Sequence, residues 1–262
     1  MSENILEINN LSKYFGGLAA VSDCSLNVKR GTITGIIGPN GSGKTTLFNL
    51  IAGNLKSSSG NVTFDEENIT DVPSYELFSK GLLRTFQIAH EFTNLSVLEN
   101  LMMVPGNQSG EKIMTALFKP GLVAQEEAVI KDKAKEVVDF LNLGHLSNEL
   151  AGNLSGGQKK LLELGRTMMV DAKLVLLDEV GAGVNRTLLK DLGTAIEKLN
   201  REKGYTFCMI EHDMDFIGRL CDPVIVMAEG SVLFEGSVEE AKKDEKVIES
   251  YLGRGSKLKD TN

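Results

Sequence analysis

The sequence contains few cysteines, fewer basic than acidic residues and no long apolar run. Its three cysteines are too few and too scattered for a zinc site or a disulfide framework. The net charge of −8 argues against a broad nucleic-acid-binding surface, so we expect no nucleic-acid partner. No segment approaches the roughly 18 consecutive apolar residues of a membrane span, and the N-terminal residues lack the features of a signal peptide. We therefore expect an intracellular protein with reduced thiols and no membrane-spanning segment.

The glycine-rich segment GPNGSGKTT, residues 38–46, is the first pattern that indicates a chemistry. It follows the apolar predicted strand 32–37 and precedes a predicted helix from about Lys44 to Ala52, which is the context that a P-loop requires. Because its glycines have no side chains, the backbone N–H groups of this segment can surround phosphate oxygens. Lys44 is expected to reach the β- and γ-phosphates of ATP, and Thr45 to place its hydroxyl on Mg²⁺. The alternative is a turn that binds nothing. The predicted nucleotide-binding residues here are Gly38, Pro39, Asn40, Gly41, Ser42, Gly43, Lys44, Thr45 and Thr46.

Two acidic residues end the apolar run at 174–177. A buried strand delivers such residues to its carboxyl edge, where open α/β sheets place ligands. Asp178 is expected to order Mg²⁺ and its waters. Glu179, one residue further, would face the attacking water as the general base, because burial beside phosphate charge raises a carboxylate pKa. The alternative is a helix N-cap followed by a solvated glutamate.

The sequence LSGGQ, residues 154–158, predicts a second phosphate-binding element. Ser155 is a favourable N-cap, and Gly156 and Gly157 leave the start of the following helix open to an anion. Since residues 38–46 already hold the phosphates in this chain, we expect Ser155, Gly156, Gly157 and Gln158 to contact ATP that is bound by another copy or a homologue.

From about Ile5 to Gly253 the chain resembles the ATPase subunit of ABC transporters, because these motifs occur in that family's order. The resemblance implies an α/β fold with a P-loop NTPase (RecA-like) core, a mostly parallel sheet, N-terminal antiparallel strands and an inserted helical subdomain. It assigns Gln87 to the glutamine that touches Mg²⁺ or water, and His212 to the histidine that contacts the γ-phosphate. Phe15, with Val21 beside it, matches the aromatic residue that stacks on adenine, and Tyr14 is the second choice.

The predicted domain covers residues 5–253. Its nucleotide-binding core comprises residues 5–87 and 154–253. Between these two segments, helical patterns replace the strand patterns, so residues 88–153 are predicted as the helical subdomain. Residues 254–262 are predicted as a disordered tail.

Shorter patterns narrow the resemblance to the ATPases of branched-chain amino acid importers. They are FGGLAAV at 15–21, RTFQ at 84–87, LSVLENL at 95–101, EHDM at 211–214 and YLG at 251–253. The chain is more similar to the longer-insert ATPase of the two in such systems. Asn185, in the segment 183–185 that crosses the dimer interface in the family, agrees with this group. Val180 departs from it, because the family has proline there.

The resemblance implies an ATP-hydrolysing motor, peripheral on the cytoplasmic face of the inner membrane. Its expected partners are permease subunits, a second ATPase subunit in a heterodimer and, indirectly, a periplasmic binding protein. The apolar residues of segment 88–100, including Phe92 and Leu95, are expected to form the permease-docking groove, or else to be ordinary core. The alternatives are a urea or amide importer, a lipopolysaccharide-type exporter, a clamp without turnover and a soluble ABC ATPase. Glu179 argues against the clamp, and a single domain without heptads argues against the soluble class.

Overall fold

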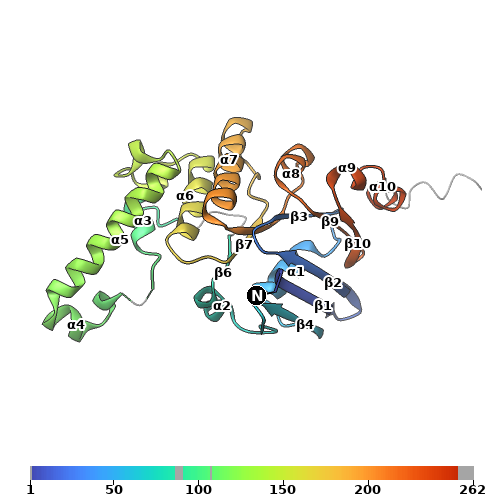
Figure 1. The fold of residues 1–262 in the computed structure, drawn as a ribbon, viewed down its shortest axis with the longest axis horizontal. Coiled ribbons are helices and arrows are strands. Elements are labelled where there is room, and N and C mark those ends of the chain that lie inside the picture. The colour runs from blue at the N-terminus through green and yellow to red at the C-terminus, as the bar shows by residue number, and fades with distance from the viewer. Residues whose placement is uncertain (1, 86–90, 107, 253–262) are drawn as a thin grey trace, which may run out of the picture. The chain divides into compact units, whose positions relative to one another are not determined.

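A computed structural model describes residues 2–85, 91–106 and 108–252 of the chain (Figure 1). The chain divides into two compact units. Unit 1 comprises residues 1–84, 173–181 and 197–262, and unit 2 comprises residues 85–172 and 182–196. None of the helices in the described ranges combines the length and the hydrophobicity that crossing a membrane requires.

The described residues of unit 1 form two sheets. The six-stranded sheet has the order β10-β9-β3-β8-β7-β6, and its strands are parallel except for β10, which is antiparallel to β9. The other sheet has the order β2-β1-β4-β5 and is antiparallel. The mostly parallel sheet and the N-terminal antiparallel strands that the sequence predicts are confirmed. The strands are β1 (Asn4–Phe15), β2 (Leu18–Lys29), β3 (Ile33–Ile37), β4 (Ser59–Phe64), β5 (Glu67–Asn68), β6 (Leu82–Arg84), β7 (Leu174–Asp178), β8 (Thr206–Ile210), β9 (Val224–Ala228) and β10 (Ser231–Gly236).

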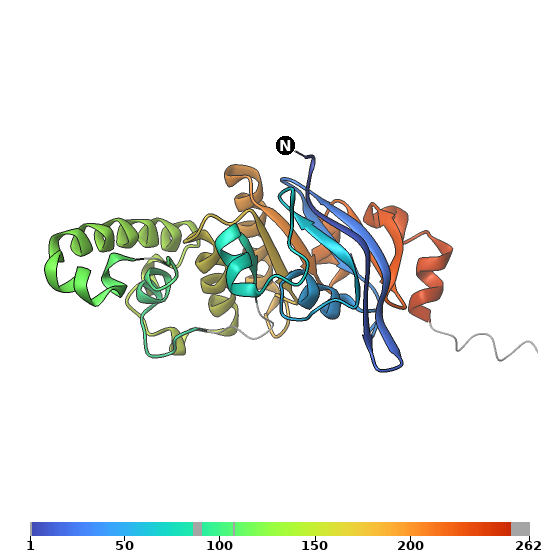
Figure 2. The same cartoon turned by 90° about the horizontal axis from the view of Figure 1, so that it is seen from below.

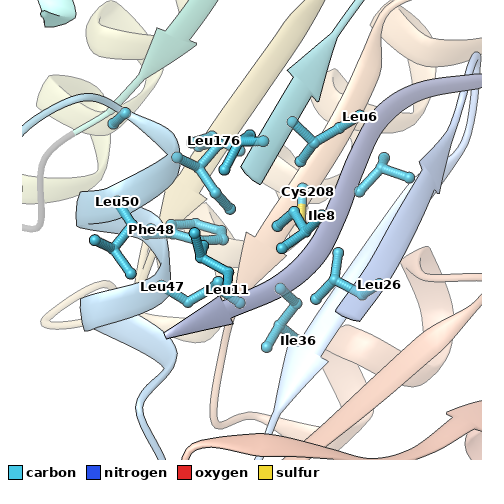
Figure 3. Packing of buried hydrophobic residues seen from close by; sticks show 14 of the residues in the cluster. Leu6, Ile8, Leu11, Leu26, Ile36, Leu47, Phe48, Leu50, Leu176 and Cys208 are labelled. Atoms are coloured by element: carbon cyan, nitrogen blue, oxygen red, sulfur yellow. The ribbon is translucent and has the colours of Figure 1, made fainter. Parts of the chain in front are cut away.

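The main core of unit 1 joins both sheets to helix α1 (Lys44–Ile51). Figure 3 shows Leu47 and Phe48 of α1 beside Leu11 of β1, and all three side chains are fully buried. Every residue of β3, β7 and β8 is buried, as expected for parallel strands that are covered on both faces. This packing holds the start of α1 beyond the carboxyl end of β3, to which the glycine-rich loop connects it.

The opposite face of β3 packs on helix α8 (Met214–Leu220). A Cβ atom at Gly35 would lie 3.0 Å from Cys221 Cβ and 3.2 Å from Ile217 Cδ1, so the glycine allows a close approach of strand and helix. The remaining helices that lie wholly in unit 1 are α2 (Ser74–Lys80), α9 (Val238–Ala241) and α10 (Glu245–Leu252).

Unit 2 is helical and contains α3 (Val97–Met102), α4 (Ile113–Phe118), α5 (Pro120–Phe140), α6 (Gly156–Met168) and the first part of α7 (Arg186–Lys203). Figure 2 shows α5 as the long green helix, with α4 beside its N-terminal end. Helices α3, α5 and α6 pack closely around Gly165, where a Cβ would lie 2.7 Å from Leu141 Cδ1 and 3.2 Å from Leu101 Cδ2.

The boundaries of unit 2 differ from those of the predicted subdomain, residues 88–153. Unit 2 also includes residues 154–172 and 182–196, so the LSGGQ segment and α6 pack with the helical insert. The physical reason is the Gly165 contact with Leu101 and Leu141, which pattern reading along the chain does not show. The predicted tail, 254–262, lies outside the described residues.

Candidate functional site

The candidate site of unit 1 lies where four neighbouring parallel strands end. In the sheet order β3-β8-β7-β6, Ile36 pairs with Ile210, Ile210 with Asp178, and Arg84 with Leu176. The segments that follow these strands therefore begin side by side. The carboxyl edge of a parallel sheet is where such folds bind ligands.

The glycine-rich loop connects β3 to α1 and is held by close backbone contacts. Gly38 has φ of 152°, and a Cβ there would lie 2.2 Å from the Met227 carbonyl oxygen of β9. Gly43 has φ of 99°, and a Cβ there would lie 2.4 Å from the Ala20 carbonyl oxygen of β2. Both glycines are thus required by conformation and by space, and they shape the loop before any phosphate is bound.

Helix α1 begins with N–H groups that are open to an anion. Leu47 is the first residue whose amide bonds into the helix, to the Gly43 carbonyl oxygen at 2.8 Å. Among the described residues, α1 has no side-chain N-cap, and its first turn contains no acidic residue. Since the first amides of a helix have no intrahelical acceptor, those of Lys44, Thr45 and Thr46 are available to phosphate oxygens.

Lys44 is the buried cation of the loop. Its ammonium donates hydrogen bonds to the carbonyl oxygens of Gly38 at 2.8 Å and Pro39 at 3.0 Å, and to Ser42 Oγ at 3.4 Å. Burial lowers the Lys44 pKa, and the nearby charges of Glu179 and Asp178 oppose this effect. The Lys44 ammonium is therefore held by neutral oxygen atoms of the loop. A bound phosphate can take the place of these oxygen atoms as its hydrogen-bond acceptor.

Two hard oxygen donors suit Mg²⁺ at this edge. Thr45 presents its hydroxyl on an exposed residue at the start of α1, and Asp178 is a 4% exposed carboxylate at the end of β7. No cluster of three or more acidic, histidine or cysteine residues that could hold a metal occurs within the described ranges. This donor set fits a cation that takes one or two protein oxygens and completes its shell with nucleotide phosphates and water, as Mg²⁺ does.

Glu179 and His212 are brought together by the neighbouring strands β7 and β8. His212 Nε2 lies 3.0 Å from Glu179 Oε1, and the Glu179 amide donates to the Ile210 carbonyl oxygen at 2.9 Å. Glu179 has φ of 48°, in the left-handed region that a glutamate rarely adopts and that costs about 1–3 kcal/mol. The two side chains are 25% and 48% exposed, so water can reach this pair.

Glu211 is a site residue to which the sequence assigned no role, although it is the first residue of the EHDM pattern. It is 5% exposed, and its carboxylate accepts hydrogen bonds from the amides of Gly181 at 2.7 Å and His212 at 3.3 Å. Burial raises its pKa, and these amide hydrogen bonds oppose the shift. Glu211 thereby joins the loop after Glu179 to the start of the histidine loop. Its place directly after an apolar strand, like that of Asp178, was the signal available in the sequence.

The predicted adenine-stacking region lies at the β1–β2 hairpin. Phe15 and Tyr14 are 48% and 49% exposed, and Lys13 Nζ lies 5.3 Å from the centroid of the Phe15 ring. Both rings therefore have a surface free for a base. Val21 is fully buried in the core of unit 1, so its side chain offers no such surface.

Unit 2 carries the LSGGQ segment at the start of α6. Ser155 is the N-cap, in a capping box with Gln158: the Gln158 amide donates to Ser155 Oγ at 3.4 Å, and the Ser155 amide donates to Gln158 Oε1 at 2.9 Å. Ser155 and Gly156 are exposed. Gly157 is buried, and a Cβ there would lie 2.5 Å from Leu188 Cδ1, so the second glycine also permits close packing against α7.

Asn185 immediately precedes α7 in unit 2. Its side-chain oxygen accepts a hydrogen bond from the Leu188 amide at 3.0 Å, and its carbonyl oxygen accepts one from the Leu189 amide at 2.9 Å. These are N-cap interactions, which asparagine and aspartate make about equally well. Val180, in unit 1, is buried at 4% exposure. Gln87 and His90 lie outside the described residues, and His145 is exposed and belongs to neither predicted site.

Comparisons with known proteins identify the family of this chain. Residues 21–182 match the ABC transporter family. The chain is 43% identical over 249 residues to a probable branched-chain amino acid transport ATP-binding protein, LivG, from Archaeoglobus fulgidus, covering 95% of each chain. It is 35% identical to the high-affinity branched-chain amino acid transport ATP-binding protein BraF of Pseudomonas aeruginosa, covering 97% and 99%.

Solved structures show the same fold. A nucleotide-free ATP-binding cassette from an ABC transporter has 39% identity and a TM-score of 0.82, with 95% of this chain and 99% of that chain covered. An ATP-binding cassette in an ADP conformation has 38% identity and a TM-score of 0.81, with 96% and 100% covered. Since the phosphate loop, the acidic pair and the family match coincide in one chain, the protein belongs to the ABC transporter family, among its ATP-binding subunits.

Proposed function

We propose that this protein is the ATP-hydrolysing motor of an importer for branched-chain amino acids. The observation that carries the proposal is the convergence of the Lys44 loop and the Glu179–His212 pair on one sheet edge. The transported substrate is inferred from the relatives that are named for branched-chain amino acid transport.

The chain's own residues account for the hydrolytic step. Lys44 and the first amides of α1 bind the β- and γ-phosphates and balance the charge that develops there. Mg²⁺, held by Thr45 and Asp178, would supply further neutralisation of the phosphate oxygens. Glu179 accepts the proton of the attacking water as the general base, and His212 orients its carboxylate through the 3.0 Å contact.

The signature segment supports a two-subunit assembly. Ser155 lies at the exposed start of α6, a helix of 13 residues with no acidic residue in its first turn. Such a helix start attracts anions, and the P-loop of the same chain already provides for its own phosphates. We propose that Ser155 and the amide of Gly157 contact ATP bound to a second ATPase subunit. A dimeric cassette of a bacterial ABC transporter is 25% identical to this chain, with a TM-score of 0.71.

The remaining partners follow from the role of motor. We propose a heterodimer with a homologous ATPase subunit, docked on permease subunits at the cytoplasmic face of the membrane and supplied by a periplasmic binding protein. Phe92, a half-exposed residue of unit 2 within the expected docking segment, supports a docking surface there.

Reconstitution of the complete complex tests the proposal. We expect leucine, isoleucine or valine, delivered by the binding protein, to stimulate ATP turnover, and Lys44→Ala to abolish that turnover. Stimulation by urea or short amides alone would assign a different cargo to the same motor. Turnover that no binding-protein ligand alters would instead favour an exporter or a soluble ATPase.

A further inference from the structure

Arg84 is a buried cation next to the site that no phosphate-binding motif explains. It ends β6 in unit 1, and its side chain is 10% exposed. One guanidinium nitrogen, Nη2, donates to Asp178 Oδ2 at 2.7 Å, and the other, Nη1, donates to Asn49 Oδ1 at 2.6 Å. The guanidinium carbon lies 6.0 Å from the centroid of the Phe48 ring. Arg84 therefore joins the end of β7 to helix α1.

Stability of the fold does not account for this arrangement. Arg84 Nε is buried and has no hydrogen-bond partner among the described residues, and an unsatisfied buried donor costs about 1–3 kcal/mol. A buried ion pair is often no more stabilising than apolar residues of the same volume. The pair is thus better explained by what it does to Asp178.

The contacts restrict Asp178 to one orientation. Asp178 is itself 4% exposed, and its Oδ2 atom is occupied by Arg84. Asn49 lies four residues after Thr45 on α1, which places the two on the same face of the helix one turn apart. The guanidinium group thereby connects α1, which carries the metal donor Thr45, to the carboxylate of Asp178, which is the second metal donor.

We propose that Arg84 is a positioning residue of the magnesium–nucleotide site. By holding Oδ2 and anchoring itself on Asn49, it fixes the carboxylate of Asp178 relative to Thr45 and leaves Oδ1 for the metal and its waters. This inference rests on the proposed function, because it requires a metal–nucleotide complex at this edge. Residues that orient a metal ligand typically contribute about 10–100-fold to metal affinity.

The test separates metal binding from nucleotide binding in the isolated subunit. Affinity for a fluorescent ATP analogue is measured with Mg²⁺ and with EDTA, and Mn²⁺ binding in the presence of ATP is measured by electron paramagnetic resonance. For Arg84→Met we expect Mn²⁺ affinity, and the gain in nucleotide affinity on adding Mg²⁺, to fall at least tenfold. Affinity in EDTA should stay within about twofold of wild type, since the predicted phosphate-binding groups are unchanged.

Arg30→Met is the matched control, because it removes another arginine–aspartate pair of unit 1. Arg30 Nη2 lies 2.5 Å from Asp65 Oδ1, and both side chains are 27% exposed, away from the P-loop strand ends. Arg30→Met should leave Mn²⁺ affinity, and the gain in nucleotide affinity on adding Mg²⁺, unchanged. Asn49→Ala removes one of the two hydrogen bonds of the fork and should give a smaller loss than Arg84→Met.

Each outcome decides the matter. If Arg84→Met leaves metal affinity unchanged or tightens it, Arg84 does not position Asp178, or it competes with the metal, and the inference is wrong. If that variant does not fold, Arg84→Lys replaces it: the charge stays but the fork is lost, so metal affinity should still fall, and an unchanged value refutes the inference. If wild-type protein binds no nucleotide with or without Mg²⁺, the proposed function itself fails.

Discussion

At the scale of single residues, Glu179 combines a strained backbone with a histidine contact. Its φ of 48° and its 3.0 Å approach to His212 place a carboxylate at the sheet edge that also carries the phosphate loop. We expect Glu179→Gln to retain ATP binding and to lose about 10²–10⁴-fold in hydrolysis rate, because an amide cannot accept the proton of water. Phosphate release and nucleotide binding are measured on the same preparation.

Glu66→Gln is the control for that experiment, because Glu66 also has positive φ, 68°, but lies in the β4–β5 turn. It should hydrolyse ATP at the wild-type rate. If Glu179→Gln keeps more than half of the wild-type turnover, another group is the base.

Glu211 predicts a pH dependence of stability. Burial raises its pKa above the ordinary 4.5, so the folded state binds its proton more tightly than the unfolded state does. The stability contributed by this residue is therefore greatest at low pH, and it falls as pH rises from about 4.5 through the raised pKa. Glu211→Gln removes this loss, because glutamine does not ionise.

Urea denaturation at a series of pH values measures the effect. We expect the free energy of unfolding of Glu211→Gln, relative to that of wild type, to increase as the pH rises above 4.5. A difference between the two proteins that is constant with pH would show that burial does not govern this carboxylate. The surface variant Glu66→Gln reports the general effect of losing one negative charge.

At the scale of elements, the loop that precedes α3 presents an aromatic side chain from a rigid base. Asn100 is fully buried, accepts the Phe92 amide at 2.8 Å and donates to the carbonyl oxygens of Phe92, Leu95 and Ser96 at 2.9–3.2 Å. Phe92 remains 48% exposed, with Arg166 5.7 Å from its ring centroid. Such a fixed, half-exposed aromatic suits a docking site for another protein.

We expect Phe92→Asp to prevent assembly with the permease and uptake, while basal ATPase activity of the isolated subunit survives. Co-purification with the permease and substrate uptake are measured together. Phe78→Asp, in α2 of unit 1, is the matched control, because Phe78 is a similarly exposed phenylalanine at 39%. If Phe92→Asp precipitates or loses ATP binding, Phe92 is part of the core and docking occurs elsewhere.

Much of the element order could be predicted because periodicity and local motifs are properties of short segments. Strand β3, its glycine loop and α1 follow directly from residues 32–52, and α6 begins after Ser155 as its capping residues indicate. Contacts between distant segments could not be predicted in this way. The packing of Gly157 on Leu188, of Gly165 on Leu101 and Leu141, and of Arg84 on Asp178 depends on tertiary neighbours. For the same reason, the burial of Val21 in the core could not be predicted from its place beside Phe15 in the sequence.

At the scale of the whole molecule, the two predicted phosphate-binding elements belong to different units of the chain. If each completes the site of another subunit, damage to one can be offset in a mixed dimer. We expect Ser155→Arg to abolish hydrolysis while leaving a folded monomer that binds ATP, because the new side chain fills the anion site at the start of α6. Hydrolysis and ATP binding of the purified variant are measured separately.

In a dimer of two copies of this chain, formed without the homologous subunit, mixing Ser155→Arg with Lys44→Ala sharpens this test. In that dimer one composite site is intact and the other carries both changes, so partial hydrolysis should return although each protein alone is inactive. Wild-type hydrolysis by Ser155→Arg alone would refute a contribution in trans. Ser96→Arg is a control for the substitution itself, since Ser96 is the N-cap of α3 in the same unit and also forms a capping box, with Glu99.

The position of β3 within its sheet has a consequence for the order in which the protein is made. Its neighbours are β8 and β9, at Thr206–Ile210 and Val224–Ala228. A growing chain therefore emerges from the ribosome with its P-loop strand long before any of these partners has been synthesised. Loops this long are closed late in folding. The P-loop strand is thus translated before the strands that flank it in the sheet, so the nucleotide site is assembled only after β8 and β9 have been made.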